Sequence, residues 1–315
     1  MILKRFISTI IYIILFILLL AGINYSVDRG YIAKVNAEAK FSCIITIFVF
    51  GLGLLVQSFG QKIKQFNKDK QLKRVIMHNL QTNVKGLDLQ LNNFSSVLMA
   101  LKSPRPDGAL LYSYAELDYF EINNFNSEDL YRIFIDYSKG NEKDNIDNLE
   151  NLRKQIRFIE SSKNDFLGIY EKLFTSIRDD GNSALDGIRE LGRFHDYEAT
   201  RLENQEKDIN EDIWFINFSN LLGQAYLVLR TNDESITDFN QLEEQIIPSF
   251  TEFFKNNIKD LRTPIVDSFF NKTITYTFQR KDTIKNLINL VDFYSQKYQE
   301  AKDFIESALI KYGKY

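Results

Sequence analysis

The sequence predicts an all-α protein: an N-terminal two-helix transmembrane hairpin, followed by a cytoplasmic helical bundle of long helices. Two observations lead to this prediction. Two uncharged apolar stretches, Phe6–Ile23 and Phe41–Gly60, are separated by a polar segment of only 17 residues. The remaining 255 or so residues contain all four prolines of the chain and long runs of apolar residues at helical spacing. We therefore divide the chain into a hairpin, residues 1–60, and a cytoplasmic helical domain, residues 61–315.

Each apolar stretch is long enough to cross a bilayer as a helix. A hydrocarbon core about 30 Å thick needs about 20 apolar residues. Phe6–Ile23 supplies 18, and Phe41–Gly60 supplies 20 if Gln57 and Ser58 lie at the headgroup level. A cleaved signal peptide is the alternative for the first stretch. It is disfavoured because Ala21-Gly22-Ile23 is a poor cleavage pattern and a second apolar stretch follows at once.

The flanking cations predict that both termini face the cytoplasm. Lys4 and Arg5 precede the first span, whereas the connecting loop, residues 24–40, contains only three cations. The second span is followed by a basic flank of six cations: Lys62, Lys64, Lys68, Lys70, Lys73 and Arg74. Because cations gather on the cytoplasmic side of a membrane, the loop is expected outside. A stop-transfer flank explains these cations, and a specific lipid site is the alternative.

The amino-acid composition bears on the source of the chain and on its partners. The chain is rich in Asn, Ile, Lys, Phe and Tyr, a bias that resembles bacterial genes of low GC content. From the two spans, and from what the resemblance described below implies, we expect a multi-pass protein of the bacterial inner membrane. The net charge of −3 is too close to neutral to favour direct nucleic-acid binding.

Three stretches keep a 3-4 spacing of apolar residues, which predicts helices packed along a seam. The second runs from Leu149 to Ile177, and the third from Ile284 to Tyr312. The first consists of Leu80, Val84, Leu87, Leu91, Phe94, Leu98 and Leu101. Additional apolar residues broaden each stripe. The breadth favours a bundle core within one domain over an intermolecular coiled coil, which remains the alternative.

Turn signals separate the remaining elements. Residues 103–108 end the first seam helix, 109–125 are irregular, Ser127 caps a helix to about Ser138, and 140–145 form a polar turn. Residues 179–182 break the second seam helix, and a further helix covers about 183–207. Residues 210–229 are apolar nearly all round and predict the most buried helix. Residues 236–270 predict two or three short helices, and 271–280 a loop or the start of the last helix rather than a strand.

Few residues suit catalysis or metal binding. The chain has two histidines, His78 and His195, and one cysteine, Cys43, which lies in the second span. His195 precedes Asp196, but neighbours on a helix are not expected to face each other, so we interpret it as a surface residue. No Gly-rich phosphate loop or nucleophile elbow is present. The sequence therefore predicts neither an enzyme nor a cofactor or metal site.

Small and polar residues in the second span suggest helix association. Gly51 and Gly53 allow close approach of a second helix, and Gln57 can hydrogen-bond across it. We expect these three residues to form a membrane association face. Because two spans cannot enclose a pore alone, permeabilisation requires a homo-oligomer.

The layout of Phe6–Ile23, Phe41–Gly60, the basic flank and a helical remainder resembles the two-transmembrane effectors of bacterial anti-phage systems of the retron type. The resemblance implies an antiviral defence protein held silent by a partner complex, containing a reverse transcriptase or another defence protein. On release, the effector permeabilises the inner membrane, and the infection is aborted. The alternative is a membrane-tethered helical scaffold or signalling adaptor without pore activity.

Overall fold

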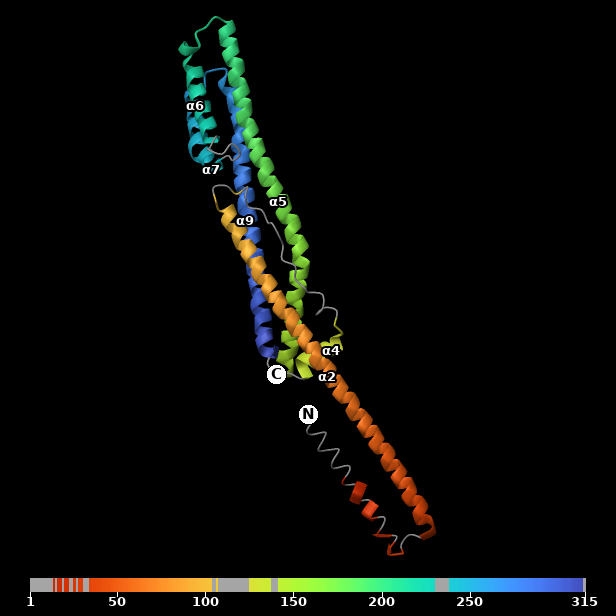
Figure 1. The fold of residues 1–315 in the computed structure, drawn as a ribbon. Coiled ribbons are helices and arrows are strands. Elements are labelled where there is room, and N and C mark those ends of the chain that lie inside the picture. Colours follow the sequence, from red (N-terminus) through yellow and green to blue (C-terminus); the bar gives the residue numbers. More distant parts are fainter. Residues whose placement is uncertain are drawn as a thin grey trace. The chain divides into compact units, whose positions relative to one another are not determined.

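The computed structural model describes residues 14, 16–18, 20–22, 25–26, 28–30, 34–103, 106, 125–136, 141–229 and 238–313 (Figure 1). All regular elements in these ranges are helical, which confirms the all-α class. The chain forms two compact units, Met1–Leu72 (the first unit) and Lys73–Tyr315 (the second unit). The division thus falls beyond the boundary expected at Gly60. Much of the expected first span and loop, and the irregular segment 109–124, lie outside the described residues.

Helix α2 (Lys34–Leu101) contains both the expected second span and the basic flank without a break. It ends just before Ser103-Pro104, where the sequence predicts the stop, because a proline disfavours helical geometry in the residue before it. In the described part of the chain, one helical stretch, Ile44–Leu101, is long and apolar enough to cross a membrane. Its most apolar 18-residue window has a mean hydropathy of 1.8, and none of that window is buried.

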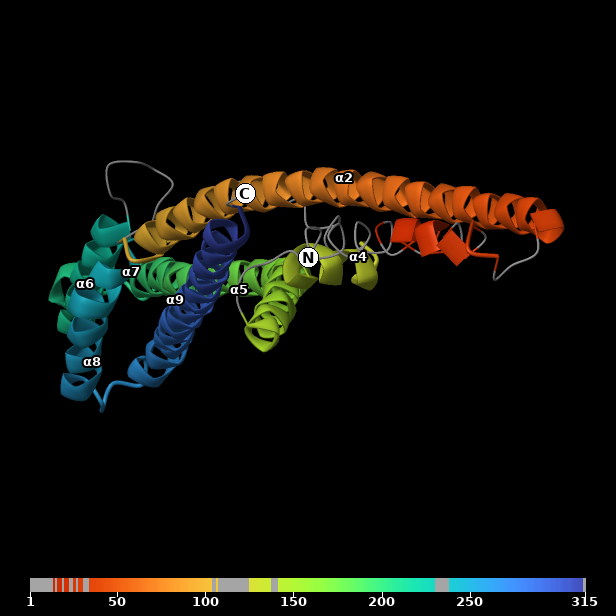
Figure 2. The same cartoon turned by 90° about the horizontal axis from the view of Figure 1, so that it is seen from below.

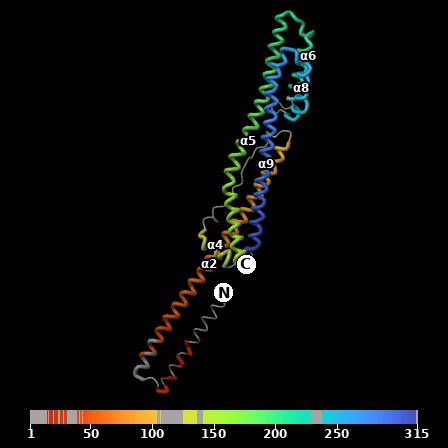
Figure 3. The backbone as a smooth tube through the Cα atoms, turned by 180° about the vertical axis from the view of Figure 1, so that it is seen from behind, coloured from red at the N-terminus to blue at the C-terminus, as the bar shows by residue number. Residues whose placement is uncertain are grey.

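The second unit is built on an antiparallel pair of long helices, α5 (Glu142–Asn204) and α9 (Thr263–Gly313), which run side by side in Figures 1 and 3. The Ser162 hydroxyl of α5 lies 3.1 Å from the Tyr298 hydroxyl near the end of α9. Lys272, near the start of α9, lies 3.3 Å from Glu190 in the last part of α5. These two contacts fix the antiparallel direction.

The seam of α9 alternates by three and four residues over the whole helix, as in a coiled coil. The predicted part, Ile284 to Tyr312, is confirmed: all its members are buried except Ile284 and Tyr294, which are half-buried. The seam continues toward the N-terminus through Thr277, Thr273, Phe270 and Val266. Helix α9 therefore contributes one continuous seam to the pair.

The prediction of a loop or helix start at residues 271–280 is wrong, because these residues lie inside α9. Polar side chains occupy the seam here and hide the apolar period. The Thr273 hydroxyl donates to the Ala184 carbonyl of α5 over 3.0 Å. Gly187 makes this approach possible, since a Cβ there would lie 2.3 Å from the same hydroxyl oxygen.

The predicted break at residues 179–182 is also wrong, and α5 passes through it. Gly181 serves packing instead of a turn. A Cβ at Gly181 would lie 3.3 Å from the Phe239 ring and 3.4 Å from Arg280 Nε. The Arg280 guanidinium in turn lies 4.0 Å from the centre of the Phe239 ring, a cation–π contact. The glycine thus admits a buried arginine and an aromatic ring beside the helix.

Within the second unit, the last part of α2 packs on the α5–α9 pair. The Phe94 ring lies 5.1 Å from the Phe166 ring of α5 and 5.5 Å from the Tyr298 ring of α9. The predicted seam residues Leu80, Leu87, Phe94 and Leu101 are buried, but Val84, Leu91 and Leu98 are only half-buried. The complete stripe is Lys73, Ile76, Leu80, Asn83, Leu87, Gln90, Phe94, Val97 and Leu101. Asn83 and Gln90 occupy it in place of the neighbouring Val84 and Leu91 that the sequence indicated.

Four short elements cover the other half of the α5–α9 pair: α6 (Ile213–Leu229), α7 (Phe239–Gln241), the π-helix η4 (Leu242–Ile246) and α8 (Ile247–Asn256). Figure 2 shows α6 and α8 side by side. Phe218, Phe250 and Phe270 lie at the centre of the apolar cluster that these elements form with α5 and α9. The predicted short helices between 236 and 270 are therefore confirmed. Pro248 and Pro264 each occupy the second residue of a helix, where the missing N–H is tolerated.

Helix α6 is buried on one side only, so the prediction of an all-round buried helix is wrong. Trp214, Phe218 and Leu222 are buried, and Tyr226 is half-buried. On the other side, Ile213 and Leu227 are 73% and 75% exposed. A single helix layer over the α5–α9 pair leaves the outer face of α6 uncovered by the described residues.

Helix termini follow the predicted turn signals closely. Asn126, one residue before the predicted Ser127, caps α4 (Ser127–Tyr131) by accepting from the Glu128 N–H, and the π-helix η2 (Arg132–Asp136) continues it. Asn141 caps α5 within the predicted polar turn. Phe134 of η2 packs edge-on to Tyr312, with ring centres 5.0 Å apart. The 3₁₀ turn η3 (Ile209–Glu211) leads from α5 into α6.

The end of α5 generates a stability prediction. Glu206 has a φ of 56°, and the N–H groups of Glu206 and Lys207 donate to the carbonyls of Glu203 and Leu202, the bonding pattern of a Schellman cap. A left-handed residue costs about 1 kcal/mol unless it is glycine. Glu206→Gly should therefore raise the midpoint of thermal unfolding by about 2–4 °C. Glu206→Ala is the matched control and should change it little. An equal gain from alanine would contradict the strain argument.

Candidate functional site

The three residues of the expected membrane association face all lie in the described part of α2. An α-helix advances about 100° per residue, so Gly51 and Gly53, two positions apart, point in nearly opposite directions. Gly53 and Gln57, four apart, share a face. The expected face is therefore split, and only Gly53 and Gln57 can act together.

The described residues of the first apolar segment lie against one side of α2 within the first unit. The Phe16 and Phe48 rings stack with centres 4.1 Å apart. Gly51 is three residues after Phe48, so it lies on this same side of α2. A Cβ at Gly51 or at Gly53 would meet no atom within 4 Å, but the two differ in exposure: Gly51 is half-buried, whereas Gly53 and Gln57 are exposed. The side of α2 that bears Gly53 and Gln57 is thus open to a further partner.

The six cations of the basic flank differ in environment. Lys62, Lys64, Lys68, Lys70 and Arg74 are exposed. Lys73 is only 8% exposed and begins the buried stripe of the second unit. Burial disfavours its ammonium form and lowers the pKa of Lys73 below the usual value. Five cations of the flank are therefore exposed, and Lys73 belongs to the packed part of the helix.

The densest charge cluster of the second unit joins the starts of α6 and α9. The Arg262 guanidinium donates to both carboxylate oxygens of Asp212, at 2.8 and 3.1 Å, and to those of Asp260, at 2.9 and 2.8 Å. Its centre lies 4.2 Å from the Trp214 ring centre. The guanidinium edge is engaged by two bidentate carboxylate pairs, and its face lies against the ring. The cluster therefore joins the segment before α6 to the segment before α9.

The pKa values in this cluster follow from its hydrogen bonds. Partial burial alone would lower the pKa of Arg262, but the bonds to Asp260 and Asp212 raise it well above its ordinary value. The bonds donated by Arg262 hold the pKa of Asp212 and of Asp260 below the ordinary value, against the opposing effect of burial. In the described residues, no three His, Cys, Asp or Glu side chains are grouped closely enough to hold a metal ion.

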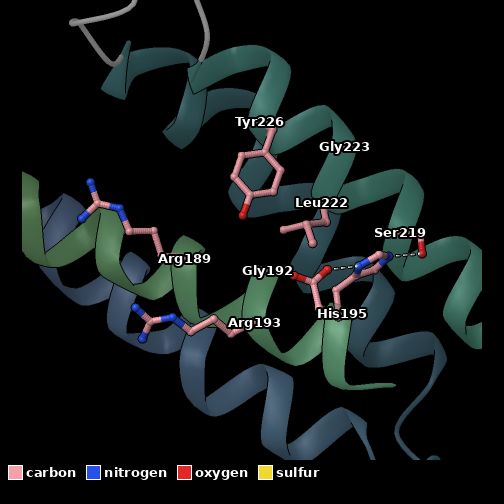
Figure 4. Close-up of a pocket in the computed structure, with 9 residues that line it drawn as sticks. Arg189, Gly192, Arg193, His195, Ser219, Leu222, Gly223 and Tyr226 are labelled. Carbon is pink, nitrogen blue, oxygen red and sulfur yellow. Dashed lines mark hydrogen bonds and ion pairs between the residues drawn. The ribbon is translucent and has the colours of Figure 1, made fainter. Parts of the chain in front are cut away.

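His195 lies in a chain of polar contacts between α5 and α6 (Figure 4). Its Nδ1 lies 3.3 Å from Asp196 Oδ1, and its Nε2 lies 2.9 Å from Ser219 Oγ. The imidazole also stacks on the Phe215 ring, with centres 4.8 Å apart. The expectation of a surface histidine that does not face Asp196 is therefore wrong, because the Asp196 side chain reaches back to the ring.

The order Asp196, His195, Ser219 matches that of a hydrolytic triad, but the protons are placed differently. The Ser219 hydroxyl lies 2.7 Å from the Phe215 carbonyl, which can only accept, so the serine proton goes there. His195 Nε2 must then donate to Ser219 and cannot take its proton, as a triad base does. Nδ1 faces a carboxylate.

The α6 residues that surround His195 could not be identified from the sequence. Ser219 and Tyr226 are far from it along the chain, and neither belongs to a recognisable motif. The spacing of Arg189 and Arg193, four apart on one helix, was a usable signal for a cationic face. Folding brings these side chains to one cavity, whereas Gly53 and Gln57, expected to form a membrane association face, belong to the other unit.

The Arg262 cluster predicts a pH-dependent contribution to stability. The folded-state pKa values of Asp212 and Asp260 are depressed, so their contribution is present above the unfolded pKa, about 4, and is lost as the pH falls below it. Arg262→Gln should cost about 3 kcal/mol at pH 7, because it leaves two half-buried carboxylates unpaired.

Thermal unfolding of the wild type and Arg262→Gln at pH 7 and at pH 3 tests this prediction. The difference between the two proteins should shrink at pH 3, where the carboxylates are protonated. Arg178→Gln removes an exposed arginine whose Nε lies 3.9 Å from Asp179, and it should have little effect at either pH. A difference that persists undiminished at low pH would show that the guanidinium acts through Trp214 alone.

The comparisons with known proteins leave the function to be argued from these residues. No protein-family model matches the chain, and no curated protein or solved structure is detectably similar to it. Two features bear on function: the exposed apolar surface of α2 and the cavity beside His195.

Proposed function

We propose that this protein is a membrane effector of bacterial antiviral defence that permeabilises the inner membrane after release from a partner complex. The observation that supports the proposal most strongly is the uncovered apolar surface of α2. Exposed side chains occur on every side of the helix: Phe41, Ile45, Ile47, Val49, Phe50, Leu54, Leu55, Val56 and Phe59. Apolar surface of this extent needs a cover other than water, and a bilayer supplies one.

A hairpin accounts for the first unit. The stacking of Phe16 on Phe48 supports two antiparallel spans within one chain. The exposed cations from Lys62 to Arg74 follow the second span and support cytoplasmic termini. The second unit would then lie in the cytoplasm, where it can bind the partner complex, such as one containing a reverse transcriptase.

Association of several hairpins provides the route through the membrane. Thr46, Gly53, Gln57 and Gly60 follow one another on α2 at intervals of seven, four and three, so small and polar residues form one stripe. In lipid, such a stripe favours close packing with another helix and hydrogen bonds across the contact. Gly51 lies on the other side, toward the first apolar segment, and serves the hairpin rather than the oligomer.

The opposed directions of Gly51 and Gly53 allow a matched test. Gly53→Leu with Gln57→Leu should abolish depolarisation of induced cells, because the two leucines block close packing of the hairpins. Gly51→Leu places the same side chain on the other side of the same helix and should leave depolarisation intact. A potential-sensitive dye measures the effect, and membrane fractionation checks that each variant is inserted.

Two outcomes would overturn the proposal. If Gly53→Leu/Gln57→Leu depolarises cells as strongly as the wild type, the stripe does not mediate association. If the wild type never depolarises cells, alone or with a triggered partner, the spans only anchor the chain. The scaffold alternative would then hold, and its activity should be lost when Ile156 and Ile159 of the α5 seam are made polar.

A further inference from the structure

A cavity of about 520 Å³ opens between α5 and α6 in the second unit, and two arginines and a tyrosine contribute to its lining. We propose that it binds a small soluble molecule through a phosphate group. The donors that face a ligand are Arg189 and Arg193 of α5 and Tyr226 of α6 (Figure 4). His195, Asp196 and Ser219 line the same cavity and bond to one another. A cavity of this volume suits a small molecule rather than a polymer. The inference does not rest on the membrane function proposed above.

The two arginines provide the charge. They are one helical turn apart on α5, and Figure 4 shows both side chains extending from the same side of the helix. Arg193 is exposed and has no ion pair or hydrogen bond among the described residues. Arg189 lies 2.7 Å from Asp186, an exposed i,i+3 pair that leaves other guanidinium N–H groups available. Planar guanidinium groups bind phosphate oxygens in pairs.

Tyr226 provides a neutral donor at a fixed place. A Cβ at position 192 would lie 2.2 Å from its hydroxyl oxygen, so the phenol reaches the backbone of α5 only because residue 192 is glycine. The hydroxyl has no hydrogen-bond partner among the described residues. A half-buried hydroxyl without a partner in a cavity wall is suited to a ligand oxygen.

His195 adds an imidazole ring whose position is fixed by three contacts. Its ring is stacked on Phe215 and hydrogen-bonded at both nitrogens, so it cannot turn away. The facing carboxylates are Asp196, which is engaged by the imidazole, and Asp186, which is paired with Arg189. Arg189 is paired with Asp186, whereas Arg193 pairs with no carboxylate among the described residues, so its guanidinium attracts an anionic group such as phosphate.

Binding of inorganic pyrophosphate to the full-length protein in detergent tests the proposal. The midpoint of thermal unfolding should rise with pyrophosphate and saturate, as ligand linkage requires, whereas sodium chloride of equal ionic strength should give no such rise. Arg193→Gln should weaken the apparent affinity about tenfold or more, and Tyr226→Phe several-fold. Both should unfold like the wild type without pyrophosphate, because Arg193 is exposed and Tyr226→Phe keeps the ring.

Arg178→Gln is the matched control, since it removes an exposed arginine of the same helix outside the cavity. It should leave the affinity unchanged. An unsaturable rise, or an equal loss of affinity in Arg178→Gln and Arg193→Gln, would overturn the proposal. A lipid headgroup offers the same phosphate chemistry. Loss of the pyrophosphate effect in micelles that contain phosphatidylglycerol would assign the cavity to lipid and reject a soluble ligand.

Discussion

Removing apolar side chains from water is the constraint that organises this chain, and its two units meet it differently. In the second unit, α5 and α9 cover each other along a seam from Thr263 to Tyr312. The seam places Phe166 and Tyr298 where Phe94 of α2 can close one half of it. It places Phe270 where Phe250 can close the other half. A fully buried aromatic side chain contributes several kcal/mol, so each additional element is held by the surface that the pair presents.

In the first unit, the described residues provide no comparable cover. Exposed apolar residues surround α2 from Phe41 to Phe59, and the described part of the first segment contacts one side through Phe16. The same helix then changes character at the basic flank and enters the packed seam at Lys73. One uninterrupted helix therefore contains a segment suited to lipid and a segment suited to protein. This division underlies our proposal that membrane action and its control belong to different parts of the chain.

Apolar periodicity predicted much of the fold. The seam residues from Leu287 to Tyr312 were found because they are mostly apolar, and the stop after Leu101 because prolines follow it. The errors occurred where polar residues or glycine occupy buried packing positions that apolar residues usually fill. Thr273, Thr277 and Arg280 continue a seam that hydropathy alone does not reveal. Gly181 signals a turn in isolation, but it admits Phe239 and Arg280 when the neighbouring elements are present.

The candidate sites were less predictable, and for different reasons. The division of Gly51 from Gly53 follows from helical periodicity alone, and the sequence contained enough to find it. The His195 cavity and the Arg262 cluster depend on partners 24 and 50 residues away along the chain. No local pattern identifies Ser219, Tyr226 or Asp212 as those partners, because the α5–α9 pair and the helices on it bring them together.

Accessibility of single cysteines along α2 tests the central claim, which is that its uncovered apolar segment lies in lipid and its basic flank emerges in the cytoplasm. In a Cys43→Ser background, a membrane-impermeant maleimide should label Ala39→Cys only in intact cells. It should label Lys68→Cys only in inverted membrane vesicles, and Phe50→Cys and Val56→Cys in neither. Labelling of positions 50 and 56 as fast as position 68 would place the segment in water and contradict the account.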